Sequence, residues 1–164
     1  MLGLPGFKIL SVREEDGELV ITIETVVAVV GCQGCGYRAE AHDRMAVTYR
    51  GLECFGRPVR LVWVKRRWRC IGPDCAARTW TEVCDDLPAR HVLSRRAGVD
   101  ACVLVGRDAM PVAGQPHRFA VAWETIMNAV AHFSEPLVDD PTAPRIADRL
   151  GWTRRRSKQW HPPS

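Results

Sequence analysis

Two closely spaced cysteine pairs, with 34 residues between them, constrain this chain more than any other feature of its sequence. The first pair is Cys32 and Cys35, and the second is Cys70 and Cys75. Cysteines a few residues apart can bind one metal ion when the backbone between them turns tightly, and Zn2+ prefers four such thiolates in a tetrahedron. Glycines within and beside the pairs favour that tight turn. The pattern therefore predicts one Zn2+ held by all four cysteines.

The sequence leaves two other interpretations of these cysteines open: a redox-active pair at Cys32 and Cys35, or buried free thiols. A redox pair of this spacing begins a helix, and Gly34 and Gly36 disfavour a helix at that point. A catalytic zinc keeps one open position and usually has a histidine or carboxylate ligand, whereas four thiolates fill the coordination sphere. The predicted cofactor is thus a structural zinc ion.

Three further cysteines bring the total to seven, and an odd count argues against a complete disulfide framework. Cys102 falls in a helical pattern and is predicted to be a core residue, Cys84 is an alternative metal ligand, and Cys54 has no predicted role. The segment Met1–Phe7 lacks the basic and apolar regions of a signal peptide, and no apolar run reaches about 18 residues. We therefore expect a cytoplasmic protein that does not span a membrane, in a compartment where spaced cysteines bind metal more often than they form disulfides.

Positive charge is concentrated just before the second cysteine pair. The net charge is only +4, but residues 57–69 contain six basic residues and no acidic one. Such a cluster indicates a polyanionic partner, because arginine and lysine pair with phosphates and release counterions from DNA. The residues predicted to contact DNA here are Arg57, Arg60, Lys65, Arg66, Arg67 and Arg69. The alternative is a solvated strand whose two tryptophans, Trp63 and Trp68, belong to the core.

Hydrophobic periodicity predicts strands in the first half of the chain. The expected strands cover residues 7–14, 18–30, 46–50, 59–70 and 79–83. Asp16-Gly17 is typical of a two-residue hairpin turn between the first two of them. The most basic strand is also the clearest one, and it leads directly into the second cysteine pair.

The second half of the chain has helical periodicity. Helices are expected over 94–110, with Ser94 as the N-cap, and over 124–133, ended by Pro136. Between them, residues 112–122 predict a short helix and a tight turn. This arrangement is similar to a helix-turn-helix, whose second helix enters the major groove of DNA, and the alternative is a plain helical hairpin, which has the same pattern. The residues predicted to face DNA from that helix are Glu124, Thr125 and Asn128.

Taken together, these patterns predict an α+β fold in which a small β-rich, zinc-ribbon-like module precedes a helical, helix-turn-helix-like segment. The expected units are an N-terminal β-hairpin over 1–31, a zinc-binding ribbon module over 32–88, a helical segment over 89–135, and a linker with a disordered tail over 136–164.

Several of these motifs resemble the N-terminal zinc-binding module of the ISL-three family of bacterial insertion-sequence transposases. The similar segments are Cys32–Gly36, Gly56–Leu61, Arg66–Cys75 and Thr79-Trp80. Residues 105–113 and 123–130 resemble the helix-turn-helix of the same proteins, and residues 135–141 resemble the linker that follows it. The resemblance implies double-stranded DNA as the partner, at the terminal repeats of a transposon, together with a second copy of the chain or the full-length transposase, in the bacterial nucleoid.

The resemblance also implies what this chain does not do. In that family a long catalytic domain follows, with three acidic residues that hold two divalent metals. The sequence differs from the family after Thr142, and Gly114–Ala120 replaces a regular helix. We therefore expect a truncated or frameshifted transposase remnant that is not itself an enzyme. The competing hypotheses are a zinc-ribbon module for protein interaction or regulation, and a redox or strand-transferring enzyme.

Overall fold

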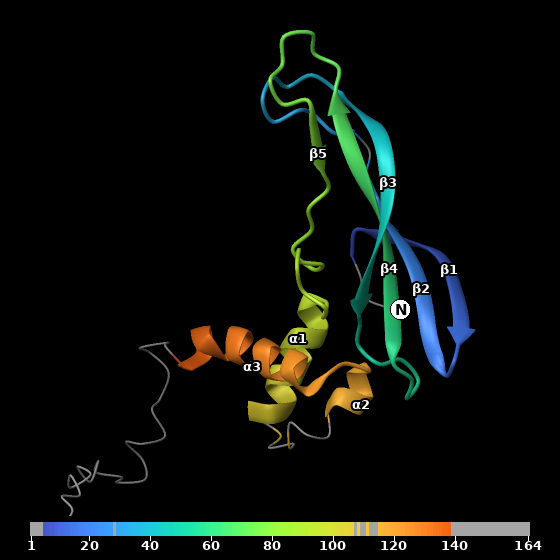
Figure 1. Cartoon of the computed structure of the whole chain (residues 1–164), viewed down its shortest axis with the longest axis vertical. Helices are drawn as coiled ribbons and strands as arrows, with labels where there is room; N and C mark the ends of the chain where they lie inside the picture. Colours follow the sequence, from blue (N-terminus) through green and yellow to red (C-terminus); the bar gives the residue numbers. More distant parts are fainter. Residues whose placement is uncertain (1–4, 28, 107, 109–110, 112–114, 139–164) are drawn as a thin grey trace, which may run out of the picture.

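A computed structural model describes residues 5–27, 29–106, 108, 111 and 115–138. These residues form a long β-rich part and a helical part at one end of it (Figure 1). The strands are β1 (Phe7–Glu15), β2 (Glu18–Thr25), β3 (Ala39–Arg50), β4 (Val59–Cys70) and β5 (Thr79–Thr81), and the helices are α1 (Arg95–Gly106), α2 (Gln115–Phe119) and α3 (Trp123–Val138). The predicted α+β class is confirmed.

Strand β4 is the centre of a five-stranded sheet with the order β1-β2-β4-β3. β3 runs antiparallel to β4 along nearly its whole length. On the other side, β2 runs parallel to the first half of β4, over Val59–Trp63, and β5 runs antiparallel to the second half, over Arg67–Arg69. The N-terminal hairpin and the cysteine-bearing strand therefore share one sheet. The unit boundaries at residues 31, 88 and 135 stay predictions.

The strand predictions differ from the structure mainly at β2 and β3. The hairpin turn at Asp16-Gly17 is confirmed, with both residues at positive φ (49° and 79°). β3 begins at Ala39, well before the predicted residue 46. The prediction placed its start too late because most side chains of this strand are exposed and show no apolar periodicity. Its hydrogen bonds to β4 hold it in the sheet. β2 ends at Thr25 and not at residue 30, close to where its pairing with β4 stops.

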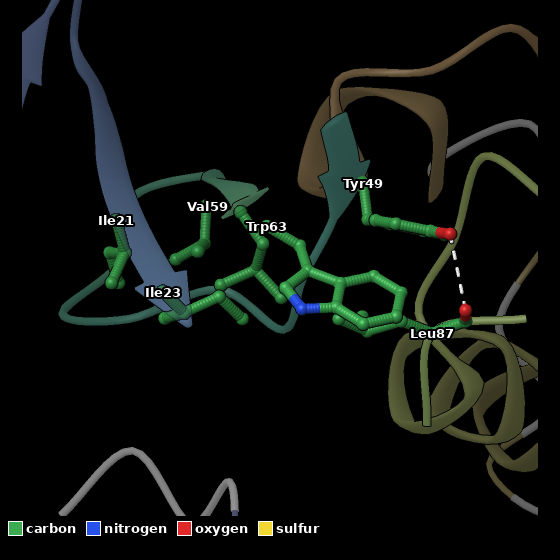
Figure 2. Packing of buried hydrophobic residues seen from close by; sticks show 7 residues of the cluster. Ile21, Ile23, Tyr49, Val59, Trp63 and Leu87 are labelled. Atoms are coloured by element: carbon green, nitrogen blue, oxygen red, sulfur yellow. Dashed lines mark hydrogen bonds between the residues drawn. The ribbon is translucent and has the colours of Figure 1, made fainter. Parts of the chain in front are cut away.

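The core of the sheet lies on one face of β2, β3 and β4. Its buried residues are Ile21, Ile23, Tyr49, Val59, Leu61, Trp63 and Leu87. Leu87, from the segment after β5, covers this face, and the Tyr49 hydroxyl donates a hydrogen bond of 3.1 Å to the Leu87 carbonyl oxygen (Figure 2). Trp63 is fully buried, as the core interpretation of the tryptophans predicted, and its indole N–H donates to Thr25 Oγ1.

The helical part has a separate core, formed by Leu93, Ala97, Ala101, Phe119 and Ile126. The predicted N-cap is confirmed, because Ser94 Oγ accepts a hydrogen bond of 3.3 Å from the Ala97 N–H. Helix α3 continues to Val138, so the prediction that Pro136 ends it is wrong. A proline removes its own backbone hydrogen bond and crowds the carbonyl four residues earlier, which can kink a helix without ending it. The predicted end of the first helix, at residue 110, lies outside the described residues.

Candidate metal centre and basic strand

The four predicted cysteine ligands meet at the end of the sheet farthest from the helices (Figure 1). Their four sulfur atoms lie within 4.8 Å of one another. The distance from Cys32 Sγ to Cys75 Sγ is 3.6 Å, and that from Cys35 Sγ to Cys70 Sγ is 3.4 Å. Zn–S bonds of about 2.3 Å in a tetrahedron require sulfur–sulfur distances of about 3.8 Å. The residues therefore fit zinc, and the predicted structural zinc site is confirmed.

The first knuckle, residues 32–36, is a tight backbone turn. The Gly36 N–H donates to the Cys32 carbonyl oxygen at 2.8 Å, and the Cys32 N–H donates to the Tyr37 carbonyl oxygen at 2.8 Å. Gly36 has φ of 75°, a conformation that favours glycine. A Cβ added at Gly34 would lie 3.5 Å from Cys75 Sγ, an ordinary van der Waals contact, so packing does not require glycine there.

The second knuckle, residues 70–75, begins at the last residue of β4. The Gly72 N–H donates a hydrogen bond of 3.3 Å to Cys70 Sγ, and a Cβ on Gly72 would lie 3.2 Å from Cys35 Sγ. The Cys70 N–H donates to the Arg78 carbonyl oxygen at 3.0 Å, just before the chain returns as β5. The metal site therefore joins the ends of β3, β4 and β5.

The four thiols influence one another's protonation. The backbone N–H of Gly34 and then that of Cys35 lower the pKa of Cys32 to about 7, against the effect of burial. For Cys70, the Gly72 N–H favours the thiolate, but burial and the thiols of Cys35, Cys32 and Cys75 outweigh it and raise the pKa to about 12. A bound dication stabilises thiolates that otherwise repel one another. A Zn2+ ion bound here would therefore favour the thiolate form of the four cysteines.

The remaining cysteines lie away from this cluster. Cys54 and Cys84 pack against the core of the sheet, and neither belongs to the four-sulfur group. Cys102 is buried in α1, as predicted from its helical pattern.

The structure separates the six basic residues predicted on β4 into two groups, and Arg66 is the clearest member of the first. Its side chain is only 11% exposed, and its Nη2 lies 2.7 Å from Glu24 Oε1. Its Nη1 also donates to the Thr25 carbonyl oxygen at 2.9 Å. Glu82 lies on the other side, 3.7 Å from Nη1. Arg66 is therefore part of the interior of the protein.

Glu24 is the centre of this buried ion-pair network. Its side chain is 3% exposed, and besides Arg66 it faces Lys8 Nζ at 2.7 Å and Arg44 Nη2 at 3.5 Å. The hydrogen bond from Lys8 holds the pKa of this carboxyl below its usual value, against burial and with further help from Arg66. One carboxylate from β2 thus pairs with cations from β1, β3 and β4.

Arg57 and Arg60 also have acidic partners in the N-terminal hairpin. Arg57 pairs with Glu14, and Arg60 lies 2.9 Å from Glu15 and 3.5 Å from Glu18. The acidic N-terminal segment and the basic strand therefore neutralise each other in part. Sequence reading missed this pairing because it depends on the parallel contact between β2 and β4, and each segment alone shows only its own charge.

The second group is Lys65, Arg67 and Arg69, which we call the outer basic row. These residues alternate along β4 on the same face as Leu61 and Trp63, beyond the end of the core. Lys65 Nζ lies 4.9 Å from the centroid of the Trp63 ring. Arg67 Nη2 donates to Thr79 Oγ1 at 3.1 Å, and the 52% exposed Arg69 lies 3.4 Å from Glu40. This row lies next to the second knuckle.

The other residues predicted to contact DNA are on α3, at the opposite end of the molecule (Figure 1). Glu124 and Asn128 are exposed, and Thr125 is half-buried. The preceding helix α2 has only five residues, and Ala120 in the following turn has φ of 50°. A short helix, a turn and a longer helix are thus present, as predicted for this segment.

A comparison with known families identifies the cysteine-containing module. Residues 28–72 match the zinc-finger of transposase IS204/IS1001/IS1096/IS1165. The predicted resemblance to transposase zinc-binding modules is therefore confirmed for this segment. The match includes Cys32, Cys35 and Cys70 and ends before Cys75, which the structure brings into the same cluster. No curated protein and no solved structure matches the chain. In the described part of the chain, no helix is long and apolar enough to cross a membrane.

Proposed function

We propose that this chain binds double-stranded DNA as the zinc-containing N-terminal part of a transposase and recognises the ends of an insertion sequence. The observation that carries the proposal is the transposase zinc-finger match over residues 28–72, with a basic row next to its second knuckle in which Arg67 and Arg69 are exposed. The described residues serve recognition in this proposal, and strand transfer is not assigned to them.

The zinc site has a mechanical role in this function. It joins the ends of the three strands that surround the outer basic row, so it fixes the positions of Lys65, Arg67 and Arg69 relative to one another. Cations held in place lose less conformational entropy when they pair with phosphates. Arg57, Arg60 and Arg66, by contrast, are assigned to the ion pairs that hold the sheet together.

The second contact surface is α3, with Glu124, Thr125 and Asn128 as the residues that face bases. β4 has 12 residues, which is about 40 Å at the rise of a β-strand. Successive major-groove contacts on one side of B-DNA are about 34–36 Å apart. Because β4 separates the metal end from the helical end (Figure 1), the proposal places two separate contacts on DNA, which a footprinting experiment would show as two protected regions.

The proposal is tested by changing the outer basic row. We expect Lys65→Ser, Arg67→Ser and Arg69→Ser together to weaken binding to duplex DNA and to reduce the log–log salt slope by about 3, since each phosphate contact contributes about 0.9. Fluorescence anisotropy with labelled duplexes between 50 and 200 mM salt measures both quantities. Arg57→Ser is the matched control, because its cation already has the partner Glu14 and its loss should leave the slope unchanged.

A second candidate function is protein interaction, and strand β1 favours it. β1 lies at the edge of the sheet, and its side chains Ile9, Leu10 and Val12 are about half exposed (49%, 48% and 56%). An exposed apolar edge strand is a template for pairing with another chain. If the intact zinc-loaded protein binds no duplex DNA at 50 mM salt, the DNA-binding proposal is wrong and this alternative replaces it.

A further inference from the structure

A hollow with both polar and apolar walls lies between the loop that precedes α1 and helix α3. Arg90 and His91 of the loop line it together with Thr125 and Asn128 of the helix. Among the described residues that form its wall, there is one arginine and no acidic side chain. The hollow thus combines a cation with two polar side chains already proposed to face DNA.

Arg90 has a backbone conformation that disfavours its side chain. Its φ is 66°, in the left-handed region where glycine is relaxed and other residues are strained. A non-glycine residue in this region is an observation from which a functional hypothesis can start. Arg90 is also exposed, and no acidic group of the described residues pairs with it.

The loop is fixed in position on both sides of Arg90 and His91. The Arg50 N–H donates to the Val92 carbonyl oxygen at 2.8 Å, and the Ser94 N–H donates to the Arg50 carbonyl oxygen at 2.9 Å, so the loop is tied to β3. On the other side, the rings of His91 and His132 of α3 lie 5.6 Å apart between centroids. The backbone that carries Arg90 is therefore preorganised next to α3.

We propose that Arg90 binds a phosphate of the DNA backbone beside the bases that Thr125 and Asn128 contact, so that the loop and α3 form one DNA-contacting surface. This inference rests on the proposed function. Arg90 lies on the loop beside the helix, and contacts from outside a recognition helix typically bind phosphates and position that helix. Base contacts, which supply specificity, are assigned to residues of α3 itself.

The test is the substitution Arg90→Gly, which removes the cation and relaxes the backbone at the same time. With two labelled 20-base-pair duplexes of unrelated sequence, we expect about tenfold weaker binding to both and a salt slope smaller by about 1. The melting temperature should be equal to or higher than that of the wild type, since glycine adopts positive φ freely. Arg13→Ser, which removes an exposed arginine of β1, is the control and should change neither affinity nor slope.

The outcomes separate this inference from the proposed function. If Arg90→Gly binds both duplexes like the wild type while the outer-row variant loses binding, Arg90 makes no phosphate contact and the inference is wrong, but the proposed function stands. A weakening confined to one duplex also overturns it, because a phosphate contact acts on every sequence. If the wild type binds neither duplex, the proposed function and the inference are both wrong.

Discussion

The two ends of this molecule are stabilised by different means. At the metal end, the knuckles and the outer half of β4 contain few buried side chains, among them Cys32 and Ala39, and most of their neighbours are exposed. At the helical end, five buried apolar residues form a core of their own. A segment with so little buried apolar surface cannot offset the entropy of ordering its chain, so a metal has to supply the missing free energy.

The difference between the two ends shows that strand β4 has two roles. The first half of β4 contributes Val59, Leu61 and Trp63 to the core, and its cations pair with acids of the hairpin. The second half leaves the core and ends at a zinc ligand, and its Arg67 and Arg69 side chains are exposed. The part of the strand that zinc stabilises is therefore the part that is proposed to bind DNA.

The largest predicted effect follows from removing the metal. Zinc binding contributes about 10–16 kcal/mol in zinc-finger peptides, which is as much as a domain's whole stability. We expect Cys70→Ser, or chelation of the wild type, to abolish hydrogen-exchange protection in the outer halves of β3 and β4. Amides of α1 and α3 should keep their protection, because their core contains no metal ligand.

The control for this experiment is Cys54→Ser, which changes a cysteine outside the cluster. This variant should bind one zinc ion per chain and retain the wild-type exchange pattern. If chelation removed protection in α3 to the same extent, the two ends would unfold as one unit. That result would contradict the conclusion that the metal end and the helical end are stabilised by different means.

The second effect concerns the ion pairs that join β4 to the hairpin. Glu24→Gln leaves the nearly buried Arg66 without its carboxylate, and breaking a buried pair in this way costs about 3 kcal/mol. Because the pKa of Glu24 is lowered in the folded state, its contribution is complete above the unfolded value of about 4.3 and disappears as the pH falls through the folded value. Urea denaturation should therefore show a large difference between wild type and variant at pH 7 that shrinks below pH of about 4.

An exposed pair supplies the control for Glu24. Glu40→Gln removes the partner of Arg69, and both of those side chains are about half exposed (54% and 52%). Its effect on the free energy of unfolding should stay below about 1 kcal/mol. A similar cost for both variants would mean that burial does not distinguish the ion pair of Arg66 from that of Arg69.

The smallest effect tests the helical end, where packing alone provides stability. A Cβ added at Gly98 of α1 would lie 2.3 Å from the Phe133 ring of α3, whereas one added at Gly106 of the same helix meets nothing within 4 Å. We expect Gly98→Ala to destabilise by about 1 kcal/mol, since the clash of about 1–3 kcal/mol exceeds the gain of about 1 kcal/mol in helix propensity. Gly106→Ala should be neutral or stabilising. Thermal denaturation measures the change in stability of both variants. Equal melting temperatures for the two variants would show that α1 and α3 do not pack closely.

Much of the candidate site could be predicted from the sequence, because its signals are local. Cysteine spacing and the neighbouring glycines indicated the zinc ligands, and the Asp16-Gly17 dipeptide indicated the hairpin. The extent of β3 could not be predicted, since its exposed side chains show no periodicity and only its pairing with β4 makes it a strand. The end of α3 was also misplaced, because a proline can kink a helix without ending it.

The sequence by itself determined which residues bind the metal, because thiolate chemistry and short spacing suffice for that prediction. Only the tertiary structure decided which of the six basic residues between positions 57 and 69 have acidic partners in the N-terminal hairpin. The acids of β1 and β2 approach Arg57, Arg60 and Arg66 through the parallel pairing of β2 with β4, and that pairing joins segments about 40 residues apart. The sequence shows which charged residues the chain contains. The free energy of each ion pair depends on the distance between the two groups and on their burial, and both are defined only in the folded protein.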